Sequence, residues 1–125
     1  MVNFYTRYGF LLITLIIAAS MSGCATPTEL RQRTPEFVIS SKLDARRVAA
    51  CISEKWENAL PLLGTQPVNL KLTKNGYAVA HGIEETIHLA DIADTTGGGS
   101  VTTYYKNRSG LIEFFDPAVK ACQSE

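Results

Sequence analysis

The sequence lacks an excess of either charge and lacks the short motifs of common catalytic sites. It has 12 Lys and Arg against 12 Asp and Glu, so the basic surface required for nucleic-acid binding is missing. Gly97-Gly98-Gly99 has no following Lys of a phosphate loop, and there is no Gly-x-Ser-x-Gly, Cys-x-x-Cys or Asp-x-Asp-x-Asp-Gly sequence. We therefore expect a protein that is not an enzyme, needs no cofactor and binds no nucleic acid.

Residues 1–23 have the features of a secretory signal. Arg7 is the single charged residue of this segment, and an apolar block of about ten residues follows at 10–19. Such a block is too short to span a bilayer. Small residues then occupy positions 20, 22 and 23, directly before Cys24, as a signal peptidase requires.

The tetrapeptide Met21-Ser22-Gly23-Cys24 resembles the lipobox of bacterial lipoproteins, usually Leu-Ala/Ser-Gly/Ala-Cys, and departs from it only at Met21. The resemblance implies cleavage before Cys24, a diacylglycerol on its sulfur and, in Gram-negative bacteria, a third chain such as palmitate on its amine. Ala25 is not Asp, and the resemblance therefore implies sorting to the outer membrane, with the body facing the periplasm. The bilayer is then the first expected partner. The alternative is an uncleaved anchor helix that continues through residues 20 and 21.

Cleavage would leave residues 24–125, with 11 basic and 12 acidic side chains, because Arg7 is the only charged residue removed. This length predicts one domain. Residues 24–36 contain two prolines and no apolar period, which predicts a lipidated N-terminus followed by a flexible tether. Residues 37–125 are expected to form the folded body.

The body is predicted to be α+β. A helix over residues 43–60 is indicated by apolar side chains at helical spacing, and Pro61 and Gly64 end it. Alternating or β-rich segments predict four strands at residues 68–72, 77–81, 86–92 and 100–107, with Asn75-Gly76 in the first hairpin. A second helix is expected over 109–123, although a strand at 111–115 is the rival interpretation. The prediction is a four-stranded antiparallel sheet with both helices on one face, in the order α-β-β-β-β-α.

Three cysteines have to be assigned. If Cys24 is lipidated, Cys51 and Cys122 form an even pair in an oxidising compartment. One lies on each predicted helix, so we expect a disulfide that links the two helices. A reactive thiol pair is the alternative, but neither a Cys-x-x-Cys motif nor a neighbouring base supports it.

One cluster of candidate metal ligands has the pattern His-x3-Glu-x2-His and consists of His81, Glu85 and His88. The region is predicted to form strands, so His81 and His88 would meet only if the register of the two strands placed them together. A transition-metal site needs three or four converging ligands, and the sequence contains no further His. We therefore predict no metal site and interpret both residues as sheet histidines.

The body resembles small uncharacterised proteobacterial lipoproteins in three segments, Cys51-Ile52, Asn75-Gly76-Tyr77 and Ala121-Cys122. This similarity implies no activity. The first functional hypothesis is a non-catalytic envelope lipoprotein, a binding or accessory domain for an unknown envelope protein. The second is an inhibitor or exclusion lipoprotein, such as a lysozyme inhibitor or a prophage factor. A metal-binding protein that uses His81 and His88 is the third.

Overall fold

The computed structural model describes residues 25–107 and 114–124. A single antiparallel sheet has the strand order β1-β5-β4-β3-β2. Its strands are β1 (Phe37–Ser41), β2 (Val68–Leu72), β3 (Gly76–His81), β4 (His88–Asp94) and β5 (Ser100–Lys106). The helices are α2 (Pro27–Arg31), α3 (Ala45–Glu57) and α4 (Phe115–Ala121), with a short 3-10 helix, η1, at Pro61–Leu63.

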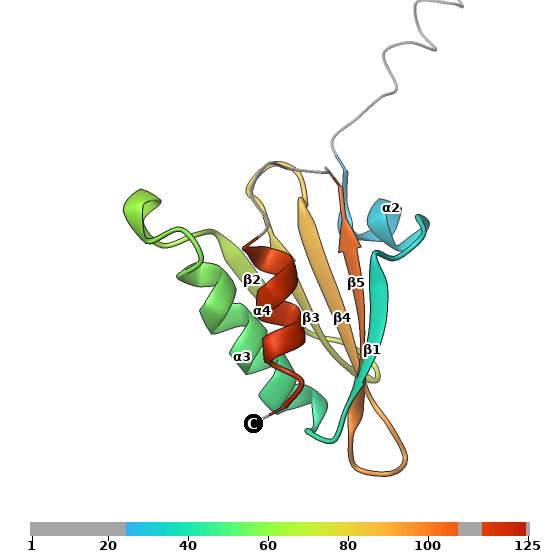
Figure 1. Ribbon diagram of the computed structural model, residues 1–125. Coiled ribbons are helices and arrows are strands. Elements are labelled where there is room, and N and C mark those ends of the chain that lie inside the picture. Colours follow the sequence, from blue (N-terminus) through green and yellow to red (C-terminus); the bar gives the residue numbers. More distant parts are fainter. Residues whose placement is uncertain (1–24, 108–113, 125) are drawn as a thin grey trace, which may run out of the picture.

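Helices α3 and α4 lie side by side on one face of the sheet, and α2 lies on the other (Figure 1). Side chains alternate between the two faces of β3 and β4, and both faces contain buried residues because helices cover each of them. Val79 and Ala90 face α3 and α4, whereas Ala78 and Leu89 face α2. The α+β class and the two helices on a common face are confirmed. The sheet has five strands in the described residues, so the prediction of four is corrected.

Helix α3 forms where the apolar spacing predicts it, although it is shorter than 43–60. The side chain of Asp44 accepts a hydrogen bond from the Arg47 N–H at 2.9 Å and caps the helix start. Val48, Ile52 and Trp56 are fully buried against the sheet. Together with Ala45 and Ala49, these side chains are the part of the core that α3 contributes between the helix layer and the sheet.

The unpredicted fifth strand is β1, at the edge of the sheet. It pairs with β5, with Phe37 opposite Tyr104 and Ser41 opposite Ser100. Its three apolar residues are consecutive and are followed by two serines, so the sequence shows no clear period of two. The strand is defined by its pairing with β5, which comes from a distant part of the chain.

The prediction of a flexible tether before residue 37 is wrong for residues 25–36. Thr26 and Glu29 form a capping box, and Leu30 of α2 is fully buried against Ala78 and Leu89 of the sheet. Arg31 also forms a bidentate ion pair with Asp91, in which both N···O distances are 2.7 Å. The segment after residue 24 is therefore part of the folded body.

The C-terminal helix is confirmed from Phe115 to Ala121. Most of the segment at 111–115, where helix and strand were rival interpretations, lies outside the described residues. So do the predicted signal at 1–23 and Cys24. In the part of the chain that is described, no helix is both long and apolar enough to cross a membrane.

Candidate functional site: a buried histidine pair and its polar chain

His81 and His88 are direct partners across β3 and β4. Their ring centroids lie 5.3 Å apart, and both residues are buried on the face covered by α3 and α4. The register therefore does bring these two predicted candidates together. Glu85 lies in the β3–β4 connection, where its carboxylate accepts a hydrogen bond from Asn107. No group of three potential ligands converges on a metal position within the described residues.

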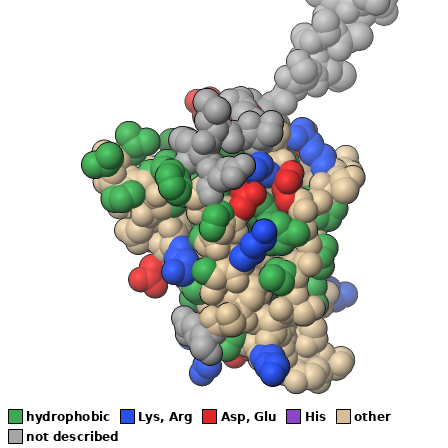
Figure 2. Space-filling view, in the orientation of Figure 1, with side chains coloured by type: hydrophobic (Ala, Val, Ile, Leu, Met, Phe, Trp, Pro, Cys, Tyr) green, Lys and Arg blue, Asp and Glu red, His purple; other side chains and the backbone are tan. Residues whose placement is uncertain are grey.

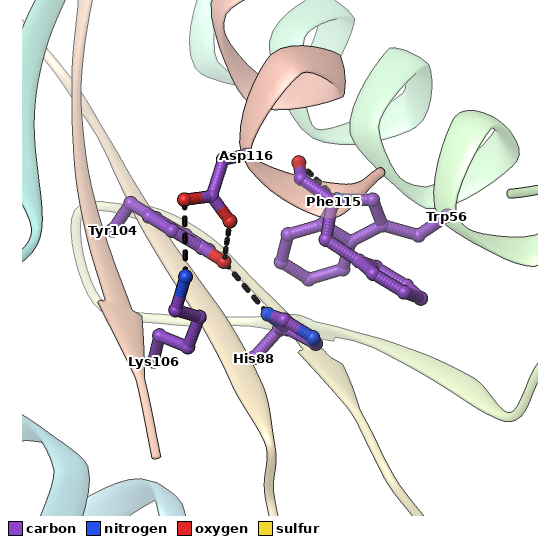
Figure 3. Close-up of polar contacts among 6 residues, drawn as sticks. All are labelled: Trp56, His88, Tyr104, Lys106, Phe115 and Asp116. Carbon is purple, nitrogen blue, oxygen red and sulfur yellow. Dashed lines mark hydrogen bonds and ion pairs between the residues drawn. The ribbon is translucent and has the colours of Figure 1, made fainter. Parts of the chain in front are cut away.

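An aromatic ring from α4 covers the histidine pair. The Phe115 ring stacks on His81 and His88, with centroid distances of 4.3 Å and 4.2 Å. The Trp56 ring packs edge-on against Phe115, and its Nε1–H donates to the Phe115 carbonyl at 3.1 Å (Figure 3). These contacts cover the faces of both imidazoles with an aromatic ring and shield them from water.

A chain of hydrogen bonds leads from His88 to the start of α4 (Figure 3). The His88 Nδ1 and the Tyr104 hydroxyl are 2.7 Å apart, and that hydroxyl donates to Asp116 at 2.7 Å. Lys106 forms an ion pair with the other Asp116 oxygen at 3.3 Å. A hydroxyl has one proton, and here Asp116 accepts it. His88 Nδ1 must then be the donor to Tyr104, which leaves Nε2 as the unprotonated nitrogen of the neutral ring.

Burial determines the protonation of this cluster. Desolvation, together with the neighbouring His81, lowers the pKa of His88 to about 4, although Asp116 opposes the shift. Desolvation also lowers the pKa of His81. Burial and the hydrogen bond to Asp116 raise the pKa of Tyr104. At neutral pH the two imidazoles and the phenol are therefore uncharged.

These four hydrogen-bonded or ion-paired residues, which we call the polar joint, connect the sheet to α4. His88, Tyr104 and Lys106 come from β4 and β5, and Asp116 lies in the first turn of α4. A neutral His88 could act chemically as a base through Nε2, but the Phe115 ring is stacked on its face. The interactions that the structure shows are those of a packed core, and they favour a role in holding α4 in place.

Two surface hollows lie away from the histidines. One, of about 530 Å³, runs along the outer side of α3 and is lined by Arg47, Ala50, Cys51, Glu54, Lys55 and Asn58. The other, of about 340 Å³, lies beside α2 and includes Arg31 and Asp91. The lining of both is mixed in charge, and neither contains a member of the polar joint.

The predicted disulfide is confirmed. Cys51 of α3 and Cys122, the C-cap residue of α4, are bonded, with a Cα–Cα distance of 5.7 Å. The bond joins positions 71 residues apart and fixes the two helices to each other at one end of α4, while the polar joint holds the other end to the sheet. Cys24 lies outside the described residues.

No protein-family model, curated protein or solved structure matches this chain.

Proposed function

We propose that this protein is a bacterial envelope lipoprotein, anchored through acylated Cys24, whose body is a non-catalytic binding or accessory domain. The cysteine set is the observation that carries the proposal. The chain has three cysteines, and Cys51 is bonded to Cys122. Cys24 therefore has no cysteine partner within the chain, and it follows Gly23 in the sequence that resembles a lipobox.

The disulfide supports an exported location because such bonds persist mainly in oxidising compartments. Two or three acyl chains on Cys24 would hold the protein on a membrane durably, whereas one chain gives only marginal binding. With Ala25 after the cysteine, we place the anchor in the outer membrane of a Gram-negative cell, with the body facing the periplasm.

A non-catalytic role is supported by the packing of two described side chains, His88 and Tyr104, whose pKa values are strongly shifted by burial. His88 and Tyr104 are both buried, and their polar atoms bond to each other and to Asp116. Their contacts stabilise α4 on the sheet. We therefore expect the body to act by binding another envelope component at its surface.

Metabolic labelling with palmitate tests the anchor. The full-length protein, produced in a Gram-negative host, should incorporate the label, and the Cys24→Ala variant should lose it. The control is Cys51→Ala/Cys122→Ala, which removes both cysteines outside the lipobox-like sequence without leaving an unpaired thiol and should keep the label. Label that persists in Cys24→Ala would refute the proposed anchor.

Cross-linking in intact cells, followed by purification from the membrane, tests the binding role. Enrichment of an envelope assembly or secretion protein supports an accessory domain. Specific enrichment of a muramidase would instead assign the protein to the inhibitors.

A further inference from the structure

Four large apolar side chains are exposed at one end of the body. Leu62 and Leu63 of η1 are 100% and 72% exposed, Ile83 of the β3–β4 connection is 86% exposed, and Phe114 before α4 is 59% exposed. They belong to three segments that are distant in sequence. A group of exposed apolar side chains indicates an interaction surface, whereas single exposed apolar residues are common on soluble proteins and indicate none.

The topology explains why these segments lie at the same end. Strand β3 ends at His81 and β4 begins at His88, so Ile83 lies in the turn between them. The Gly82 N–H donates to the Pro67 carbonyl, and the Gln66 N–H donates to Glu57, which ties this turn to the end of α3 and the η1 region. In Figure 1, η1, this turn and the start of α4 lie at one end of the molecule, and Figure 2 shows hydrophobic side chains gathered over η1.

The described chain begins at this same end. The Ala25 carbonyl accepts a hydrogen bond from the Thr86 N–H at 2.8 Å, and Ala25 is only 4% exposed. Cys24 is covalently bonded to Ala25, and successive Cα atoms are about 3.8 Å apart. A lipid on Cys24 would therefore be attached beside the β3–β4 turn, with no free spacer between the anchor and the body.

We infer that this apolar end, formed by Leu62, Leu63, Ile83 and Phe114, rests on the lipid bilayer and inserts into its interface. The inference depends on the proposed anchor at Cys24. The apolar face of an interfacial amphipathic helix enters the boundary between headgroups and acyl chains by roughly 5–10 Å, and we expect a similar depth for this apolar end. The charged residues of the 82–87 turn are Glu84 and Glu85, and this turn contains no Lys or Arg, so we expect the contact to be apolar and not to depend on anionic lipid.

This orientation directs the opposite end of the sheet away from the membrane. That end contains the β2–β3 turn and the β4–β5 turn, near Leu72 and Asp94. Leu72 is 71% exposed and is therefore a matched control, because it is as apolar and accessible as the residues at the membrane end.

Fluorescence quenching in vesicles tests the orientation. The full-length lipoprotein is extracted from membranes and reconstituted into phosphatidylcholine vesicles, with or without brominated acyl chains. Ile83→Trp and Leu62→Trp report on the membrane end, and Leu72→Trp reports on the far end. All three retain Trp56, whose emission is subtracted by means of the wild-type protein. We expect brominated lipid to quench the added emission at positions 83 and 62 at least about twofold more than at position 72, because side chains that enter the interface by roughly 5–10 Å approach the acyl-chain bromines, whereas position 72 lies at the far end of the sheet.

Intact mass measured on the same samples separates the two proposals. Acylated protein with equal quenching at all three positions would overturn the orientation and leave the anchor intact. Protein without acyl chains would refute the anchor and, with it, the orientation that depends on it. If replacing part of the phosphatidylcholine with phosphatidylglycerol leaves the quenching unchanged, the apolar contact is supported; quenching that requires the anionic lipid would contradict it.

Discussion

The imidazoles of His81 and His88 face each other across β3 and β4 at a centroid distance of 5.3 Å, under the single ring of Phe115. Two bases held this close and buried away from water resist protonation, because a charge on either ring would be poorly solvated and would repel a charge on the other. The pair therefore links the stability of the fold to pH.

We predict that the protein loses stability as the pH falls from about 6.5 to about 4. In this range the unfolded chain binds a proton at His88, whose ordinary pKa is 6.5, while the folded protein, with a pKa of about 4, does not. Stability therefore increases with pH through this window and levels off above it. The upper limit for His88 is roughly 3 kcal/mol.

Urea unfolding at several pH values measures this effect. The control variant is His88→Asn, whose amide can still donate to Tyr104 but does not titrate. Its free energy of unfolding should vary less with pH than that of the wild type. Parallel curves for the two proteins would contradict a buried neutral His88.

Removing the Tyr104 hydroxyl should destabilise the protein by about 1–3 kcal/mol, because it leaves His88 and Asp116 without their shared partner. The change is Tyr104→Phe. Its control is Tyr105→Phe, since the adjacent residue faces the opposite side of the sheet. Thermal unfolding of the two variants should give clearly different midpoints, and equal midpoints would show that the polar joint contributes little.

The disulfide should contribute about 4 kcal/mol, the value that chain entropy gives for a loop of this size. The double variant Cys51→Ala/Cys122→Ala should therefore unfold at a lower urea concentration than the wild type. The wild type measured with a reductant should resemble the double variant. If neither the variant nor the reductant changes the unfolding midpoint, the bond does not stabilise the fold.

Docking of α2 should depend on Leu30, which is fully buried although it lies in a segment predicted to be a tether. We expect Leu30→Ala to cost about 2–4 kcal/mol. Leu72→Ala, a change at an exposed position, should stay within about 0.5 kcal/mol of the wild type. Equal stability of the two variants would mean that α2 is not part of the cooperative fold.

The sequence predicts those helices and strands whose residue pattern lies within the element itself. The stripe of Val48, Ile52 and Trp56 specifies α3 because one helix face is buried, and the alternation at 68–72 specifies β2. The disulfide was predictable because one cysteine lies on each helix. Periodicity did not reveal β1 or α2, although Thr26 and Glu29 show the capping-box spacing that was available as a signal.

Contacts between distant segments were not predictable in the same way. Burial of Leu30 depends on Ala78 and Leu89, which come from two strands far along the chain. The meeting of His81 and His88 depends on the register across the 82–87 connection, and a shift of one residue would have placed one ring on the other face. The bonds from Tyr104 to His88 and Asp116 join three elements and follow from that register.

The most direct test of the account is the intact mass of the mature protein extracted from bacterial membranes. We predict a polypeptide that begins at Cys24, carries the additional mass of two or three acyl chains and retains the Cys51–Cys122 bond under non-reducing conditions. A membrane-extracted chain that still contains residues 1–23, or one that begins at Cys24 without acyl chains, would contradict the lipoprotein assignment.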